Sequence, residues 1–276
     1  MGRWYGSGYS PVMNLATASI NGIDIAFTDS GGAGPAVLLS HGFLMDHTMF
    51  DAQVAALGAD YRCIGWDERG FGATPAPGPF TYWDSADDAV ALLDHLGIDQ
   101  AVFVGMSQGG FLSLRAALAH PTRVRAVVLI DSAADTDSPE TLAGYGAMMA
   151  ALTSVDDATF DPVAAGVADL ILRDPTLIAE WVPKWKARRS PHDLSIPGDT
   201  LLARDDISAR MGEIACPLLV VHGSADAAIT LDRAQAVAAA VQDCRGVVVV
   251  DGGAHAPNMS HPGQVNDALL AFLAGL

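Results

Sequence analysis

Basic residues are scarce in this chain. Its 276 residues include 15 lysines and arginines against 32 aspartates and glutamates, which gives a formal net charge of −17 at pH 7. A surface of this sign repels the phosphate backbone, so we expect no nucleic-acid partner.

Cysteines are also few. Cys63, Cys216 and Cys244 are odd in number, and their spacings match no zinc motif. Two of them, Cys63 and Cys216, lie in or beside apolar runs, so we expect buried free thiols and no metal site. Free thiols are typical of a reducing compartment, which favours a cytoplasmic location.

Long apolar segments are missing as well. The sequence contains no run of about 18 apolar residues, so we expect no transmembrane helix and no membrane partner. Residues 1–14 contain aromatics and glycines but no continuous apolar segment, so we expect no signal peptide.

The chain does have ample apolar material. Half of its residues are hydrophobic and 17% are charged, which is typical of a globular protein. A chain of this length can bury one large core, and we expect one domain with an insertion.

Strand-like apolar runs alternate with stretches of helical periodicity. Residues 18–28 predict an opening hairpin that turns at Asn21-Gly22. The alternation predicts an α/β fold with a mostly parallel sheet and helices on both faces. The later strands are expected at residues 36–40, 61–66, 101–104, 124–130, 217–221 and 247–250.

The alternation of strand-like and helical stretches is interrupted between residues 133 and 211. This stretch has helical patches, many Asp and Pro residues and no convincing strand. We therefore expect a core in two parts, residues 1–132 and 212–276, with a helical cap insertion at 133–211.

Residues 105–109, Gly-Met-Ser-Gln-Gly, follow an apolar strand-like run and precede a helical stretch. Strand, G-x-S-x-G and helix together are typical of a nucleophile elbow, a sharp turn that presents the serine hydroxyl above the sheet. The flanking glycines are needed because side chains would not fit beside so tight a turn. The pattern predicts Ser107 as a catalytic nucleophile.

A serine nucleophile requires a general base and a carboxylate that orients it. In this architecture they follow in the order Ser, Asp or Glu, His, in turns after strands. Asp226 and His255 fit that order. The alternatives are that Asp226 caps the next helix and that His255 is a loop residue bonded to backbone. Asp131, at the end of the strand 124–130, is a rival acid or a cap of the insertion.

Two other histidines each stand directly before a glycine at the end of a predicted strand. His41 and His222 are expected to have structural roles because of that position. The oxyanion hole requires two backbone N–H donors, which we expect from Gln108 and Phe43. The alternative is that His41-Gly42 only turns the chain from strand to helix.

These motifs together resemble the α/β-hydrolase superfamily from about residue 20 to the C-terminus. The chain looks like the capped esterases, enol-lactonases and cofactor-free perhydrolases of that superfamily. The resemblance implies an eight-stranded sheet, a helical cap after Asp131 and structural roles for Asp67 and Arg69. The matching segments are 41–43, 67–72, 105–109, 223–226 and 253–255.

Two positions depart from the relatives. Gln108 replaces a methionine common after the nucleophile, and Thr230 stands where many relatives have proline. Ser107 argues against epoxide hydrolases and haloalkane dehalogenases, which are similar but use an aspartate at the elbow.

The expected function is a serine hydrolase that cleaves a small ester or lactone, with no metal or organic cofactor. Alternatives are a C–C bond hydrolase or a perhydrolase with the same triad, and a hydrolase-like ligand receptor. Large apolar cap residues either line the substrate pocket or pack within the cap, and substituting Ala147 or Met148 is expected to alter acyl selectivity. The candidate pocket residues are Tyr145, Ala147, Met148, Met149, Trp181 and Trp185.

Overall fold

The computed structural model describes residues 13–58, 60–188 and 194–276. Most of the segment 1–14, in which we expect no signal peptide, lies outside the described residues. Among the described helices, none is long and apolar enough to cross a membrane.

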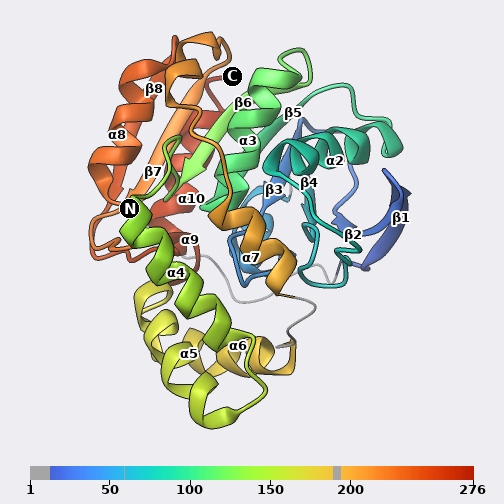
Figure 1. Cartoon of the computed structure of the whole chain (residues 1–276). Helices are drawn as coiled ribbons and strands as arrows, with labels where there is room; N and C mark the ends of the chain where they lie inside the picture. Colours follow the sequence, from blue (N-terminus) through green and yellow to red (C-terminus); the bar gives the residue numbers. More distant parts are fainter. Residues whose placement is uncertain (1–12, 59, 189–193) are drawn as a thin grey trace.

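Eight strands form a single sheet in the order β1-β2-β4-β3-β5-β6-β7-β8 (Figure 1). The pairs β1·β2 and β2·β4 are antiparallel, and every other pair is parallel. This arrangement confirms the predicted α/β class with a mostly parallel sheet. The strands are β1 Ala16–Ile20, β2 Ile23–Asp29, β3 Ala36–Ser40, β4 Arg62–Trp66, β5 Ala101–Met106, β6 Val124–Ile130, β7 Leu218–Gly223 and β8 Cys244–Val250.

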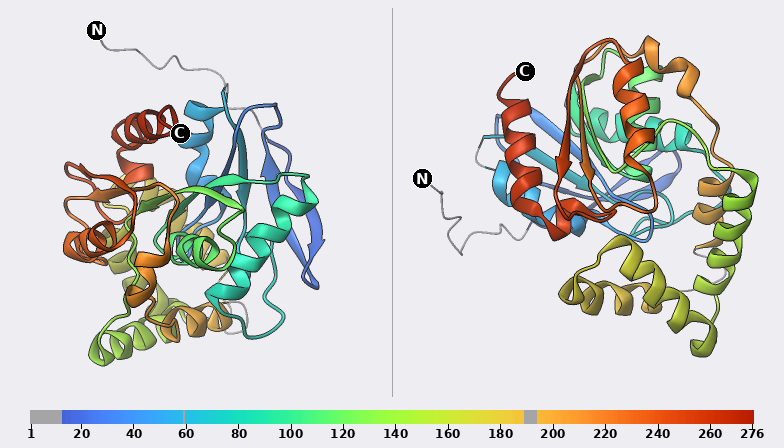
Figure 2. Two further views of the ribbon diagram at one scale, coloured as in Figure 1. Left: turned by 90° about the horizontal axis from the view of Figure 1, so that it is seen from above. Right: turned by 90° about the vertical axis from the view of Figure 1, so that its left-hand side faces the viewer.

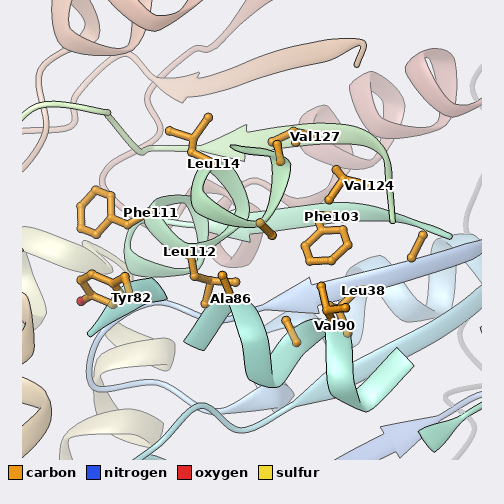
Figure 3. Packing of buried hydrophobic residues seen from close by; sticks show 14 of the residues in the cluster. Leu38, Tyr82, Ala86, Val90, Phe103, Phe111, Leu112, Leu114, Val124 and Val127 are labelled. Carbon is orange, nitrogen blue, oxygen red and sulfur yellow. The ribbon is translucent and has the colours of Figure 1, made fainter. Parts of the chain in front are cut away.

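Helices cover both faces of the sheet, so the central strands are apolar on both sides. Within β3, Leu38 packs toward one face, while Val37 and Leu39 pack toward the other. Helices α2, α3 and α8 cover the Leu38 face, which Figure 3 shows with Phe103 beside Leu38. Helices α1 and α10 cover the opposite face. These helices are α1 Asp51–Leu57, α2 Tyr82–His95, α3 Gln108–Ala119, α8 Leu231–Ala240 and α10 Pro262–Leu273.

The insertion between β6 and β7 is helical. Helices α4, α5 and α6 stand away from the sheet as a lobe, and α7 returns beside the main domain (Figures 1 and 2). Phe160, Trp181 and Trp185 are buried inside the lobe and join the apolar cluster of the α1 and α10 face. These helices are α4 Pro139–Leu152, α5 Asp157–Ile171, α6 Pro175–Arg188 and α7 Ser195–Leu202, followed by the 3-10 helix η2 Ser208–Glu213.

Two short elements complete the fold near the carboxyl edge of the sheet. The 3-10 helix η1, His47–Phe50, leads into α1, and α9, Pro257–Ser260, precedes α10. Parallel strands bring their carboxyl ends to one edge, where loops from distant parts of the sequence meet. The loops after β3, β5, β7 and β8 carry the residues of the candidate site.

Candidate active site

Ser107 occupies a strained turn between β5 and α3. Its backbone has φ 51° and ψ −112°, in the half of conformational space that L residues seldom adopt. A Cβ at Gly105 would collide with the Gly109 carbonyl, and one at Gly109 would collide with the Ser40 carbonyl. Ser107 N also donates to the Ile130 carbonyl at 2.9 Å. The close backbone packing therefore requires these glycines and holds the serine in place.

The structure brings Ser107, His255 and Asp226 into one hydrogen-bonded line. Ser107 Oγ lies 3.0 Å from His255 Nε2, and His255 Nδ1 lies 2.8 Å from Asp226 Oδ2. An ionised carboxylate only accepts hydrogen bonds, so Nδ1 carries the imidazole proton and Nε2 can accept from the serine hydroxyl. Ser107 and His255 are 7% and 6% exposed, which leaves a narrow access for a small molecule.

The carboxylate of Asp226 is anchored on its other oxygen. Asp226 Oδ1 accepts from Ala228 N at 2.8 Å and from Ile229 N at 3.1 Å. Burial alone would raise the pKa of Asp226, but His255 and these donors outweigh it and lower the pKa overall. Asp226 is therefore ionised at neutral pH, as an orienting carboxylate must be.

Asp131, the rival acid, lies directly behind this pair. Its side chain is fully buried, and Oδ1 accepts from Gly223 N at 2.9 Å. Burial, reinforced by the neighbouring Asp226, raises the pKa of Asp131 well above its usual value. The structure thus places an acid with a lowered pKa against His255 and an acid with a raised pKa behind it.

The other two histidines bond to backbone. His222 Nε2 lies 3.0 Å from the Ile229 carbonyl, which braces the loop of Asp226. His41 Nε2 accepts from Glu68 N at 3.0 Å, so His41 Nδ1 is the donor to the Gly42 carbonyl at 2.8 Å. Both contacts are structural, in the manner expected for histidines at strand ends.

The candidate oxyanion donors flank Ser107. Gln108 begins α3, and Phe43 lies in a turn after β3 that is closed by Met45 N donating to the Gly42 carbonyl. Within the described residues, neither Phe43 N nor Gln108 N has a hydrogen-bond partner. Two such N–H groups beside a nucleophile are what an oxyanion hole requires.

The loop that contains Asp67 and Arg69 supports the site from behind. Asp67 accepts from His47 N at 2.9 Å and from Ala73 N at 2.8 Å. Arg69 Nη2 donates to Asp88 Oδ1 of α2 at 2.8 Å. These contacts join separate parts of the main domain and agree with the structural roles that the resemblance implies.

A cavity of about 80 Å³ lies between Ser107 and the helices inserted between β6 and β7, which we refer to as the cap. Ser107, His255 and Phe43 line it at the sheet edge. The cap contributes an apolar wall, together with two charged side chains. These cap residues are Asp137, Tyr145, Met148, Met149, Val167, Leu170, Ile171, Leu201 and Arg204.

The candidate pocket residues divide into two groups. Tyr145, Met148 and Met149 line the cavity on α4, whereas Ala147 is exposed and lies outside its lining. Trp181 and Trp185 are buried in the cap interior, and Trp185 also borders a separate hollow beside Phe71. A helix exposes a different face at each position, so the sequence spacing alone did not separate Ala147 from its neighbours.

Sequence reasoning did not identify several cavity residues. Val167, Leu170 and Ile171 come from α5, and Arg204 lies two residues after the end of α7. Ala228 and Ile229 also line the cavity, and their place just after Asp226 was an available signal. No local pattern marks the cap residues, because their position depends on how the cap folds back over the sheet.

Asp131, Asp226 and His255 are also the one group in the described chain whose spacing could hold a metal ion. One ligand atom of each lies within 4.8 Å of the others. Asp226 and His255 are hydrogen-bonded to each other, and burial raises the pKa of Asp131, which disfavours its ionised form. This donor set fits a proton relay better than a cation, and the absence of a metal stays a prediction.

A family model described as the alpha/beta hydrolase fold matches residues 35–161. Among curated proteins, 3-oxoadipate enol-lactonase 1 of Acinetobacter baylyi is 27% identical over 256 residues, covering 88% of this chain and 90% of that protein.

Solved structures agree along nearly the whole chain. A thermophilic esterase from Thermogutta terrifontis superposes with a TM-score of 0.84 at 27% identity, covering 95% of this chain and 98% of the other. The enol-lactonase from Burkholderia xenovorans LB400 superposes with a TM-score of 0.83 at 26% identity, covering 94% and 100%. The shared sheet, the elbow and these similarities show that the chain has the α/β-hydrolase fold.

Proposed function

We propose that the protein is a serine hydrolase that cleaves small carboxylic esters or lactones through an acyl-enzyme. The observation that carries this proposal is the hydrogen-bonded line from Ser107 Oγ through His255 to Asp226, at 3.0 and 2.8 Å. Two similar proteins, one named an enol-lactonase and the other an esterase, support the same chemistry.

The first half of the reaction forms the acyl-enzyme. Ser107 Oγ attacks the carbonyl carbon while its proton moves to His255 Nε2. Asp226 stabilises the imidazolium, and the N–H groups of Phe43 and Gln108 bind the oxyanion. The imidazolium then gives its proton to the leaving alkoxide oxygen as the C–O bond breaks.

The second half releases the acid. A water molecule loses a proton to His255 Nε2 and attacks the acyl carbon. The tetrahedral intermediate collapses, and Ser107 leaves with the proton returned by His255. No step requires an oxidant, a metal or an organic cofactor.

We further propose that residues 133–211 act as a cap domain that closes this site. Helices α4 and α5 of this lobe supply a large part of the cavity wall, and their apolar side chains keep water scarce around the acyl group.

Turnover of p-nitrophenyl acetate tests the proposal. The wild type should release many equivalents of p-nitrophenol, and Ser107→Ala should lose about 10⁴-fold or more in kcat while it remains folded. Release of about one equivalent would indicate a ligand receptor with a silent triad. Activity of Ser107→Ala close to wild type would exclude the assigned nucleophile.

A further inference from the structure

Arg204 is the one basic side chain that lines the cavity of Ser107 and His255 in the described chain. It lies two residues after the end of α7, and its side chain is only 3% exposed. Most of the remaining lining is apolar. A buried arginine in such a wall is costly unless charged or polar partners satisfy it.

The partners of Arg204 satisfy only part of its guanidinium. Nη2 donates to Asp137 Oδ2 at 2.5 Å, and Nη1 donates to the Leu201 carbonyl at 3.0 Å. Nε is buried and has no hydrogen-bond partner among the described residues. The guanidinium also lies over the ring of Phe111, 4.7 Å from its centroid. Phe111 belongs to α3, the helix that begins at the elbow.

Arg204 shares its carboxylate partner with a second arginine. Asp137 Oδ1 also accepts from Arg233 Nη1 at 2.7 Å, so two arginines share one carboxylate whose side chain is 9% exposed. Arg233 has a second carboxylate partner, Asp135, whose side chain is 39% exposed. Within the described residues, Arg204 therefore has only the shared carboxylate of Asp137 as an anionic partner.

We propose that Arg204 forms a subsite for a carboxylate that the substrate carries away from the scissile carbonyl. This inference rests on the proposed hydrolase function and narrows its substrate class to half-esters or lactones of dicarboxylic acids. Arginine recognises carboxylates through directed N–H donors, and a ligand carboxylate would supply the missing acceptor for Nε. Met148 and Met149 line the cavity as well and offer an apolar surface to a methylene chain.

Two esters that differ in one group test the inference. Monomethyl adipate and methyl hexanoate share the chain and the methyl ester, and differ only in a terminal carboxylate or methyl. The wild type should prefer monomethyl adipate. Arg204→Met, which keeps a flexible apolar stem over Phe111, should lose about 10- to 100-fold in kcat/KM for monomethyl adipate and much less for methyl hexanoate.

Arg233→Met is the matched control. It removes the other cation bound to Asp137 but lies outside the cavity lining. It should leave the ratio of kcat/KM between the two esters closer to wild type than Arg204→Met does. If both variants lower activity on both esters equally, Arg204 is only an anchor of the cap and the subsite is excluded.

Binding to Ser107→Ala gives a readout that does not depend on turnover. Calorimetric titration should show tighter binding of monomethyl adipate than of methyl hexanoate, and adding Arg204→Lys should weaken that preference. Equal affinity for both esters would overturn the subsite, even if the wild type proves an active esterase. Failure of all esters to turn over would instead count against the hydrolase function.

Discussion

The carboxyl groups of Asp131 and Asp226 lie within 4.8 Å of each other, and their pKa values are shifted in opposite directions. Burial raises the pKa of Asp131, while His255 helps to lower that of Asp226 against the effect of burial. Two carboxylates this close in a buried site do not ionise together easily. The opposite pKa shifts therefore favour the negative charge on Asp226, the acid that contacts His255.

Asp226→Asn should consequently cost far more activity than Asp131→Asn. Asparagine at 226 removes the charge that stabilises the imidazolium and can hold the imidazole of His255 in the wrong tautomer. We expect kcat to fall by about 10⁴-fold. Asparagine at 131 replaces a neutral group by a neutral group of the same shape. Steady-state kinetics of both variants on one ester give the comparison, and a larger loss from Asp131→Asn would identify Asp131 as the orienting acid.

Glu68 should make the protein less stable as the pH rises. The side chain is 1% exposed, and burial raises its pKa well above 4.5, with Gln108 offsetting only part of the effect. Above its ordinary pKa the unfolded chain releases this proton while the folded chain keeps it. The free energy of unfolding therefore falls with pH in that window, by up to about 1.4 kcal/mol per pH unit.

Glu68→Gln removes this contribution. Its stability relative to wild type, measured by denaturant unfolding, should increase as the pH rises from about 4.5. Glu213→Gln serves as a control, because its stability relative to wild type should change with pH in the opposite direction. Arg210 lowers the pKa of Glu213, and the stabilisation from this pair is lost as the pH falls. A Glu68→Gln difference that stays constant with pH would mean that Glu68 is ionised in the folded protein.

Met149→Ala should change acyl selectivity. Met149 is 6% exposed and lines the cavity, so its truncation enlarges the space beside the acyl group. The ratio of kcat/KM between hexanoate and acetate p-nitrophenyl esters should shift by the equivalent of about 1–3 kcal/mol at most. Ala147→Leu, on the exposed face of the same helix, is the control, and an equal shift in both variants would remove the assignment of α4 to the pocket.

Gly109→Ala should destabilise the protein severely, because its Cβ would meet the Ser40 carbonyl. Neither backbone can move without disturbing the elbow. Gly144→Ala, in the exposed helix α4 where an added Cβ meets no atom, should instead stabilise the protein by about 0.5–1 kcal/mol. Thermal unfolding of the two variants compares them directly, and equal melting temperatures would contradict the packing described for the elbow.

Local features of the sequence were sufficient for the fold and for the proposed nucleophile. Strand-like and helical stretches alternate along the sequence. The mostly parallel sheet that this alternation predicts is observed in the structure. Gly105, Ser107 and Gly109 lie within one turn, so a short motif contains the whole geometric requirement of the elbow. The order Ser, Asp, His along the chain, with each residue in a loop after a strand, then indicates Asp226 and His255. The loops that follow parallel strands lie at one edge of the sheet.

Tertiary structure decided what depends on contacts between distant segments. Sequence position leaves Asp131 and Asp226 equally able to follow a strand, and the hydrogen bond between Asp226 and His255 separates them. Arg204 has no motif, and it enters the cavity because α7 folds back beside the elbow helix. Ala147 and Met149 are two positions apart, yet Ala147 is exposed to solvent and Met149 lines the cavity. The packing of α4 determines which face of the helix is covered.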